Sequence, residues 1–350
     1  MPTKVTARSH SNIALCKYWG KLDLPRAEGE AWVEWRLRKI NTPATPSISL
    51  SLAELVTETT VARLPDDAEQ DEVLLDGVVA DKGTHSRLSV YLNLWRAAGI
   101  IEGRYSIDSR NNFPTASGLA SSASGYAALA KALAGFAAEP LSTMELSRWA
   151  RRGSGSAARS IYGGISALPS GPDAAAYLAV PAAESPFAMV VCIIEAPPKD
   201  VSSRDGMSRS AATSPFYKAW LKQSARDYDM IIESLWRGTR TSEVEPEDLL
   251  WRIGSIAERN CLAMHAVMQT STPPLLYWAP GTLAVMHAVR SWREDGGLQS
   301  YFTIDAGPHV ELLCLKQHAD ALAAQAAKIP GVSQVIASQA GGSAEIISSE

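Results

Sequence analysis

The sequence of 350 residues has few cysteines, no excess of positive charge and no long apolar run. Its four cysteines, Cys16, Cys192, Cys261 and Cys314, are scattered without the spacing of a metal site, which favours reduced thiols in a cytoplasmic protein. The formal net charge of −4 and the pI near 5.9 exclude a broad basic surface for nucleic acid or an acidic membrane. Residues 1–13 contain no apolar signal core, and no segment is long and apolar enough to span a bilayer. We therefore expect no nucleic-acid or membrane partner, and an anionic ligand would need a local site.

Two common nucleotide-binding signatures are also absent, the Walker loop and the dinucleotide fingerprint, and no repeat at solenoid spacing is present. The hydrophobic content of 46% and the charged content of 20% are those of an ordinary globular protein with an ample core. Strand and helix patterns are mixed without regular βαβ alternation, which predicts an α+β fold. Residues 181–186 are the best candidate boundary, so we divide the chain into residues 1–185 and 186–350.

Alternation and helical periodicity predict the individual elements. Residues 47–52 predict a strand with residues 58–64 as its partner, and Asp76-Gly77 predicts a hairpin turn. Residues 199–207 are expected to form a polar loop. Further strands are expected at residues 3–14, 105–109, 187–194, 301–305, 310–315 and 345–348, and helices at residues 84–98, 123–136, 142–152, 215–235, 246–268, 281–292 and 318–328.

A stretch of small residues, 111–126, is the first candidate ligand loop. It begins with polar turn formers and proline and continues into an alanine-rich helix. Small residues let the backbone approach a ligand, and a helix N-terminus suits a phosphate. The hydroxyls of Ser121, Ser122 and Ser124 could bind phosphate oxygens or a magnesium ion. A serine-capped core helix has the same pattern, so this loop alone leaves both interpretations open.

Three other segments carry charged or hydroxyl groups beside glycine. Residues 15–21 combine two lysines and two aromatic residues, as in an anion pocket or as in a strand end with solvated lysines. Residues 153–164 form a second small-residue loop with hydroxyls and one arginine, or else a plain helix–helix connection. Asp305 precedes a Gly-Pro turn, where an aspartate is often only a turn former.

Together these segments resemble the mevalonate diphosphate decarboxylases, a family of the GHMP small-molecule kinase superfamily. The matching motifs run in family order over nearly the whole chain, at residues 11–21, 112–122, 153–164, 200–207, 264–265, 271–274 and 303–308. The resemblance implies an α+β GHMP kinase fold, with an N-terminal lobe containing a left-handed βαβ unit, a ferredoxin-like C-terminal lobe and a central cleft. It also implies ATP and Mg²⁺ as cofactors and a homodimer as the usual assembly.

The activity implied by the resemblance is ATP-dependent decarboxylation of mevalonate 5-diphosphate to isopentenyl diphosphate in isoprenoid biosynthesis. A tertiary hydroxyl is a poor leaving group, so it is phosphorylated first, and loss of phosphate and CO₂ then gives the alkene. Such a site must align a carboxylate, a hydroxyl and a phosphate, so positioning and electrostatics supply most of the catalysis.

The resemblance also implies roles for individual residues. Asp305 orients or deprotonates the 3-hydroxyl, and Lys17 keeps the Asp305 carboxylate ionised. Arg159 binds the substrate carboxylate with help from Asn12. The expected contacts to the substrate's diphosphate come from Tyr18, Lys21, Ser154, Ser156, Arg204 and Met207. The expected contacts to ATP come from Ser117, Gly118, Ser121, Ser122 and Ser203, with Ser122 also reaching magnesium. His265 matches a family position, and we interpret it as structural.

One segment departs from the family pattern. Residues 23–41 are longer than usual and carry Trp32 and Trp35, and residues 43–47 place proline where the family commonly has a polar residue. This segment lies close to Lys21 in the sequence, so it leaves the distal group of the substrate open. The alternative is a related ATP-dependent decarboxylase or kinase for another 3-hydroxy acid, such as mevalonate 5-phosphate. A non-catalytic ligand-binding homologue is less favoured, because Lys17, Arg159 and Asp305 are all present.

Overall fold

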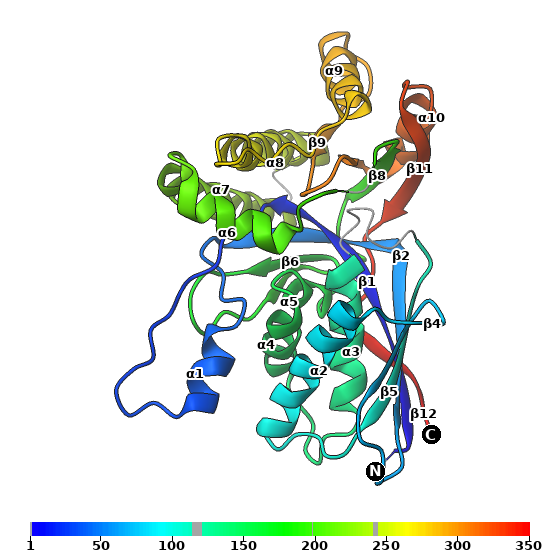
Figure 1. The fold of residues 1–350 in the computed structure, drawn as a ribbon. Coiled ribbons are helices and arrows are strands. Elements are labelled where there is room, and N and C mark those ends of the chain that lie inside the picture. The colour runs from blue at the N-terminus through cyan, green and yellow to red at the C-terminus, as the bar shows by residue number, and fades with distance from the viewer. Residues whose placement is uncertain (1, 114–120, 198, 241–243) are drawn as a thin grey trace.

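The computed structural model describes residues 2–113, 121–197, 199–240 and 244–350, which fold into two lobes around two sheets (Figure 1). In the described chain, the first sheet has eight strands in the order β12-β1-β2-β5-β3-β4, with β6 paired to β2 and to β7. The second sheet has four strands in the order β11-β8-β10-β9. The strands are β1 (Lys4–Cys16), β2 (Ser47–Arg63), β3 (Glu72–Leu75), β4 (Val78–Val79), β5 (Tyr105–Asn111), β6 (Ile165–Leu168), β7 (Tyr177–Val180), β8 (Phe187–Ile194), β9 (Tyr301–Thr303), β10 (Val310–Leu315), β11 (Val332–Gln339) and β12 (Glu345–Ser349).

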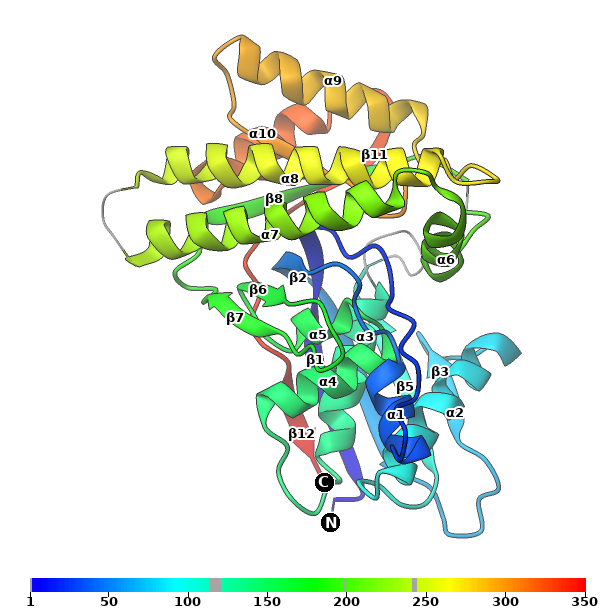
Figure 2. The ribbon, with the colours of Figure 1, turned by 90° about the vertical axis from the view of Figure 1, so that its left-hand side faces the viewer.

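The helices cover the two sheets and fill the space between them. The helices of the first half are α1 (Trp32–Lys39), α2 (Lys82–Ala97), α3 (Ser121–Ala134), α4 (Thr143–Gly153) and α5 (Ala157–Ser160). Those of the second half are α6 (Ser203–Thr213), α7 (Tyr217–Arg240), α8 (Pro246–Gln269), α9 (Pro280–Glu294) and α10 (Ala319–Ala326). Helix α3 packs on β1 and β2, and α8 contacts both β1 and β9 while lying beside α7 (Figure 2). No helix in the described part of the chain is long and apolar enough to cross a membrane.

The second lobe has a ferredoxin-like strand order. Numbered along the chain, β8, β9, β10 and β11 lie in the order four-one-three-two, and each adjacent pair is antiparallel. Val310 and Leu312 on one face of this sheet pack with Val285 of α9 and Leu322 of α10. Leu313, on the other face, packs with Ile253 of α8. The expected two-lobed α+β fold is confirmed.

The boundary at residues 185/186 stays a prediction, with one amendment from the strand pairing. Strand β12 belongs to the second stretch of sequence but pairs with β1 of the first sheet. The two chain ends lie side by side (Figure 1), and the Thr3 N–H donates a hydrogen bond to the Glu350 carbonyl at 2.7 Å. The C-terminal strand therefore closes the first sheet.

Two local expectations were wrong. The strand expected at residues 47–52 and its expected partner form one continuous strand, β2, because residues 53–57 contain no turn former; β2 pairs with β1 on both sides of an irregularity between Ser51 and Val56. Residues 203–207 are not a loop but the start of α6, whose first turn is capped by the Ser202 hydroxyl bonded to the Asp205 N–H at 3.2 Å. By contrast, the helix expected at residues 142–152 is confirmed, with a capping box of Ser142 and Glu145 at its start, and so is the hairpin at Asp76.

Candidate active site

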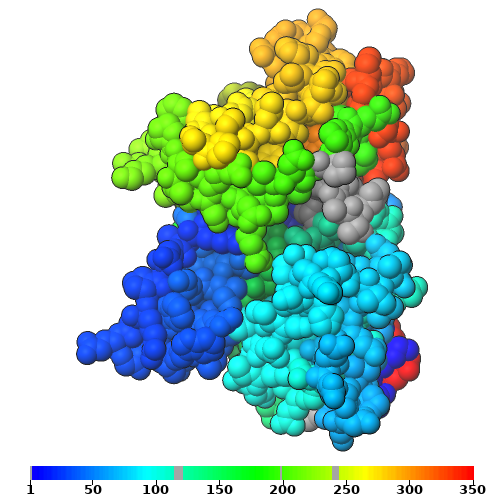
Figure 3. Space-filling model, viewed as in Figure 1, coloured from blue at the N-terminus to red at the C-terminus, as the bar shows by residue number. Residues whose placement is uncertain are grey.

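A cavity of about 560 Å³ lies between the two lobes and is bounded by segments far apart in the sequence. In Figure 3 it opens where the blue segment around residues 22–42, the cyan α2 and the green α6 approach one another. Ser117 and Gly118, two of the candidate residues, lie outside the described residues. The other candidates all line this cavity: Asn12, Lys17, Tyr18, Lys21, Ser121, Ser122, Ser154, Ser156, Arg159, Ser203, Arg204, Met207 and Asp305.

An ion pair of the buried Lys17 with the partly exposed Asp305 lines the cavity. Lys17 follows β1 and Asp305 follows β9, so each side chain is delivered by the end of a strand from a different sheet. The Lys17 Nζ to Asp305 Oδ1 distance is 2.5 Å. Lys17 is 1% exposed, whereas Asp305 is 26% exposed and faces the cavity. The carboxylate is therefore accessible to a ligand, while the buried ammonium pairs with its Oδ1.

The environment keeps Lys17 charged. Burial disfavours its charge, but Asp305 and neighbouring acidic groups outweigh burial and raise the pKa of the ammonium above its ordinary value. Glu311 of β10 is also buried, and its carboxyl oxygens have no hydrogen-bond partner among the described residues. Burial and then the nearby Asp305 raise the pKa of Glu311 well above its ordinary value, although Lys17 opposes this, and the shift favours the neutral form of Glu311.

Arg159 also lines the cavity, and three hydrogen bonds hold its guanidinium in place. Its Nε donates to Ser49 Oγ at 2.9 Å, and one terminal nitrogen donates to Ser47 Oγ at 2.5 Å. The other terminal nitrogen donates to Asn12 Oδ1 at 3.2 Å. A guanidinium has five N–H donors, so one donor on each terminal nitrogen is left to bind a carboxylate. Burial lowers the pKa of Arg159 to about 10, so the group remains cationic at neutral pH.

Close glycine contacts explain the small-residue loop around residue 154. A Cβ on Gly153 would lie 2.1 Å from the Tyr126 ring, and a Cβ on Gly155 would lie 2.3 Å from the Tyr18 ring. The two aromatic rings therefore occupy the space that larger residues would need. Ser154, between the glycines, lies 3.3 Å from Ser122, measured between their Oγ atoms. The two small-residue loops thus meet and present hydroxyls to one cavity.

Ser124, the third hydroxyl of the first loop, does not reach the cavity. It is buried, and its Oγ is bonded to Thr57 Oγ1 at 2.6 Å. It lies on the face of α3 that packs on β2, three residues after Ser121 and two after Ser122. Helical spacing places Ser122 on the other side of α3, whereas Ser121 reaches the cavity from the first residue of the helix.

Two further cations, Lys21 and Arg204, form what we call the cationic end of the cavity. Lys21 and Arg204 both line it, and burial together with the charge of Arg204 lowers the pKa of Lys21 to about 8, although Asp205 opposes this effect. Like charges held this close repel each other, and an anionic ligand would relieve the repulsion. This end therefore suits a phosphorylated group.

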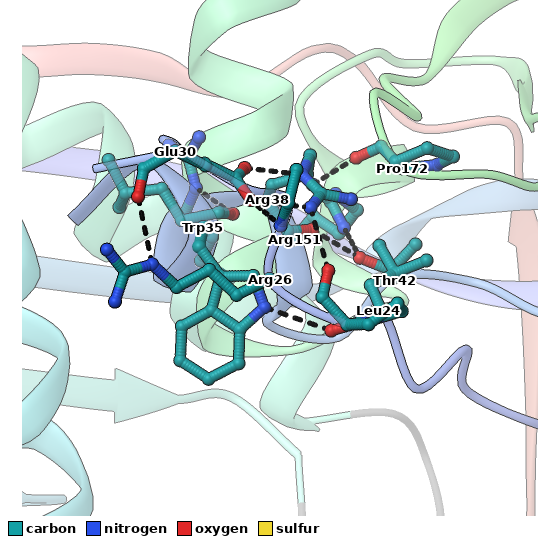
Figure 4. A network of polar contacts seen from close by, with 12 residues as sticks. Leu24, Arg26, Glu30, Trp35, Arg38, Thr42, Arg151 and Pro172 are labelled. Carbon is teal, nitrogen blue, oxygen red and sulfur yellow. Dashed lines mark hydrogen bonds and ion pairs between the residues drawn. The ribbon is translucent and has the colours of Figure 1, made fainter. Parts of the chain in front are cut away.

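The segment at residues 22–42 is a folded excursion beside this cationic end. Figure 4 shows Glu30 binding the Arg38 guanidinium through both carboxylate oxygens, at 2.8 and 2.9 Å. Arg151 of α4 is buried and donates to Thr42 Oγ1 at 3.0 Å, which anchors the excursion to the first lobe. The excursion ends at Asn41, which lines the cavity and accepts the Tyr18 hydroxyl on its carbonyl at 3.1 Å.

Two cationic residues of the cavity were given no role by the sequence. Lys199 lies near Asp305, and its Nζ contacts Ser203 Oγ and the Ala306 carbonyl, each at 3.3 Å. Arg87 lines the cavity from α2. Neither residue lies in a matched motif, so only the strand and helix packing reveals them. His265, by contrast, is buried against Trp278, and burial lowers its pKa to about 4.

The hydroxyl groups fit a magnesium ion carried by phosphates. Within the described residues, no group of three or more His, Cys, Asp or Glu side chains could hold a metal ion. Magnesium in nucleotide sites keeps several waters and is bound largely through phosphate oxygens. Ser122 and Ser154, 3.3 Å apart at Oγ, offer oxygens of the right kind on the wall of the cavity.

Models of one protein family match both halves of the chain. The model of the diphosphomevalonate decarboxylase-like N-terminal domain matches residues 9–179. The model of the mevalonate 5-diphosphate decarboxylase C-terminal domain matches residues 189–346. The matched residues include the segments that line the cavity.

Individual relatives agree with these models. The chain is 31% identical to the diphosphomevalonate decarboxylase of Ganoderma lucidum, over 90% of this chain and 79% of the relative. It is 29% identical to the phosphomevalonate decarboxylase of Haloferax volcanii, over 91% of this chain and 90% of the relative. A solved structure, MDDEF in complex with MVAPP, AMPPCP and magnesium, is 36% identical with a TM-score of 0.85, over 99% of each chain.

Proposed function

Because this chain belongs to the mevalonate diphosphate decarboxylase family of ATP-dependent decarboxylases, we propose that its substrate is mevalonate 5-diphosphate and its product isopentenyl diphosphate. The observation that carries the proposal is the contact of Lys17 Nζ with Asp305 Oδ1 at 2.5 Å, in the cavity that Arg159 also lines. A carboxylate and a guanidinium on the walls of one cavity fit the 3-hydroxyl and the carboxylate of a 3-hydroxy acid. Phosphate-binding groups lie in the same cavity.

The first step is transfer of the terminal phosphoryl group of ATP to the 3-hydroxyl. Asp305 accepts the hydroxyl proton at Oδ2, the oxygen that is not bonded to Lys17. The hydroxyl oxygen then forms a bond to the γ-phosphorus while the bond between that phosphorus and ADP breaks. Lys17 pairs with the Asp305 carboxylate before the transfer and offsets the negative charge that gathers during it.

The second step is loss of the new phosphate and of CO₂. The bond between carbon 3 and the phosphate oxygen breaks, and the electron pair of the bond to the carboxyl carbon becomes the alkene. Arg159 holds the carboxylate through its two remaining N–H donors, which fixes the direction in which CO₂ leaves. Its bonds to Ser47, Ser49 and Asn12 fix the guanidinium in advance, so it loses little conformational freedom on reaching the transition state.

The nucleotide is proposed to lie along the two serine loops. Ser121, Ser122 and Ser203 line the cavity and offer hydroxyls to ATP phosphates. A magnesium ion there would neutralise charge on the β- and γ-phosphates, and Ser122 is the residue we propose for its contact. Support comes from the relative solved with AMPPCP and magnesium.

A second candidate substrate is mevalonate 5-phosphate. One relative of similar identity is a phosphomevalonate decarboxylase, and the excursion at residues 22–42 lies beside the cationic end of the cavity. The two cations Lys21 and Arg204 favour the larger charge of a diphosphate. We place mevalonate 5-diphosphate first for that reason.

The test is to compare ADP and CO₂ release from mevalonate, its 5-phosphate and its 5-diphosphate at equal concentrations. We expect both products in equal amounts from the diphosphate, and loss of both in Asp305→Asn. Faster release from the 5-phosphate would establish the second candidate instead. ADP without CO₂ would identify a kinase, and tight binding without either product would identify a ligand-binding homologue. We also propose a homodimer, which size-exclusion chromatography with light scattering tests.

A further inference from the structure

Asn260 of helix α8 forms a hydrogen bond with the main chain of Lys17. The Lys17 N–H donates to Asn260 Oδ1 at 2.8 Å, and Asn260 is fully buried. The other end of the amide, Nδ2, donates to Asp227 Oδ2 of α7 at 2.9 Å. Asp227 is also buried, and its Oδ1 accepts from Gln223 at 2.8 Å and from Arg259. A carboxylate can only accept, so Asp227 forces Nδ2 toward itself and Oδ1 toward Lys17.

The same helix also binds the main chain that delivers Asp305. Cys261 accepts the N–H of Ile304 on its sulfur at 3.1 Å, and His265 Nε2 lies 3.3 Å from the Ile304 carbonyl. Ile304 directly precedes Asp305, and Cys261 directly follows Asn260. A short stretch of α8 therefore contacts the backbone at Lys17 and the backbone beside Asp305.

These contacts set the spacing of a pair whose members come from different sheets. Lys17 and Asp305 are 288 residues apart in sequence, and their 2.5 Å contact requires both backbones to be placed closely. We propose that Asn260, oriented by Asp227, is a positioning residue that holds Lys17 at the distance from Asp305 needed for phosphoryl transfer. The expected effect on kcat rests on the proposed function, but the hydrogen-bond chain from Asp227 to Lys17 is independent of the substrate.

The first variant is Asn260→Ala, which removes the acceptor for the Lys17 N–H. A displacement of about 1 Å in an aligned site costs on the order of 100-fold in rate. We expect kcat to fall by about that factor, while KM for the acid and for ATP stays near wild type, because Asn260 contacts neither. The matched control is Ser338→Ala, which removes a buried hydroxyl that accepts the Glu54 N–H at 3.1 Å and lies in β11 outside the cavity. It should lower thermal stability with kcat unchanged.

The second variant exchanges the two partners, Asn260→Asp together with Asp227→Asn. Asn260→Asp alone places two buried carboxylates against each other and should lose activity. In the double variant, the new amide at 227 donates to the new carboxylate at 260, which still accepts the Lys17 N–H. We expect kcat to return to near the wild-type value. A residue that only stabilised the core would instead lower thermal stability in Asn260→Asp and leave the kcat of the folded enzyme unchanged.

The outcomes separate this inference from the proposed function. Wild-type kcat in Asn260→Ala, an equal loss in Ser338→Ala, or failure of the exchange to restore kcat would each overturn it. Rates are measured with whichever 3-hydroxy acid the wild type turns over fastest, so a different substrate leaves the inference intact. If wild type turns over none, the proposed function fails, and a crystal structure of Asn260→Ala decides. An unchanged Lys17 Nζ to Asp305 Oδ1 contact would then overturn the positioning role.

Discussion

Replacing Arg159 by lysine tests the binding of the substrate carboxylate directly. Lysine keeps the positive charge but offers a point charge in place of the planar fork. Arg159 uses three N–H donors on Ser47, Ser49 and Asn12, which leaves two for the carboxylate. Arg159→Lys loses at least one of those two charge-assisted bonds, each worth about 1.5–3 kcal/mol.

That loss sets the expected size of the kinetic effect. About 1.5–3 kcal/mol of transition-state binding corresponds to a fall in kcat/KM of about 10- to 150-fold. The assay is coupled ADP release, run in parallel with trapping of CO₂ from carboxyl-labelled substrate. Since the proposed carboxylate contact would also direct decarboxylation, we expect CO₂ release to fall at least as far as ADP release.

The control for Arg159→Lys is Arg151→Lys. Arg151 is equally buried and also makes hydrogen bonds through its guanidinium, to Ile40, Thr42 and Pro172, but it does not line the cavity. It should lose stability with a much smaller fall in kcat/KM. Near-normal decarboxylation by Arg159→Lys, or an equal kinetic loss in Arg151→Lys, would refute the assigned contact.

Three further predictions follow from the ionisable groups. Asp305→Asn should lower kcat by about 100- to 10,000-fold, the range for a positioned acid or base, with the Kd of the acid near wild type by calorimetry; loss of binding alone would contradict the role. The pKa of Lys21 is lowered to about 8, so KM for the phosphorylated acid should rise as the pH passes above 8, and Lys21→Arg, which stays charged, should flatten that rise in initial-rate profiles. Burial lowers the pKa of His265 and of His309 to about 4. The neutral histidines contribute their full stability above pH 6.5. Each should lower the free energy of unfolding by about 3 kcal/mol as the pH falls to 4, and urea unfolding at pH 7 and pH 5 should show the beginning of this loss.

Local signals predicted the elements whose determining contacts lie close together in sequence. The capping box of Ser142 and Glu145 spans three residues, and the hairpin turn depends on Asp76 and Gly77 alone. Strand β11 had no such signal, because its residues are mostly half-exposed and its partner β8 is far away in sequence. Ser202 and Asp205 did carry the cap of α6, but the loop motif around them obscured it.

The candidate site depended on contacts between distant segments, which pattern alone could not decide. The residues around Lys17 were as consistent with a solvated lysine as with an anion pocket. The ion-pair partner of Lys17, Asp305, lies 288 residues later in the sequence. Arg87 and Lys199 lie outside the matched motifs and reach the cavity only through the packing of α2 and of the chain before α6. The family resemblance supplied the residues of the cavity wall, whereas the supporting bonds from α8 required the structure.

The excursion at residues 22–42 bears on the distal group through Tyr18. The Tyr18 hydroxyl donates a hydrogen bond to the Asn41 carbonyl at 3.1 Å. Burial raises the pKa of Tyr18, so the side chain stays a neutral phenol. A phosphate oxygen at neutral pH mainly accepts hydrogen bonds, so Tyr18 has no donor for it while the Asn41 contact lasts. Under the proposed function, we expect recognition of the distal phosphate to depend on Lys21, Arg204 and the serine hydroxyls. Because the excursion engages Tyr18, we expect the number of positive charges at this end of the cavity to decide whether a substrate with one phosphate or with two binds better.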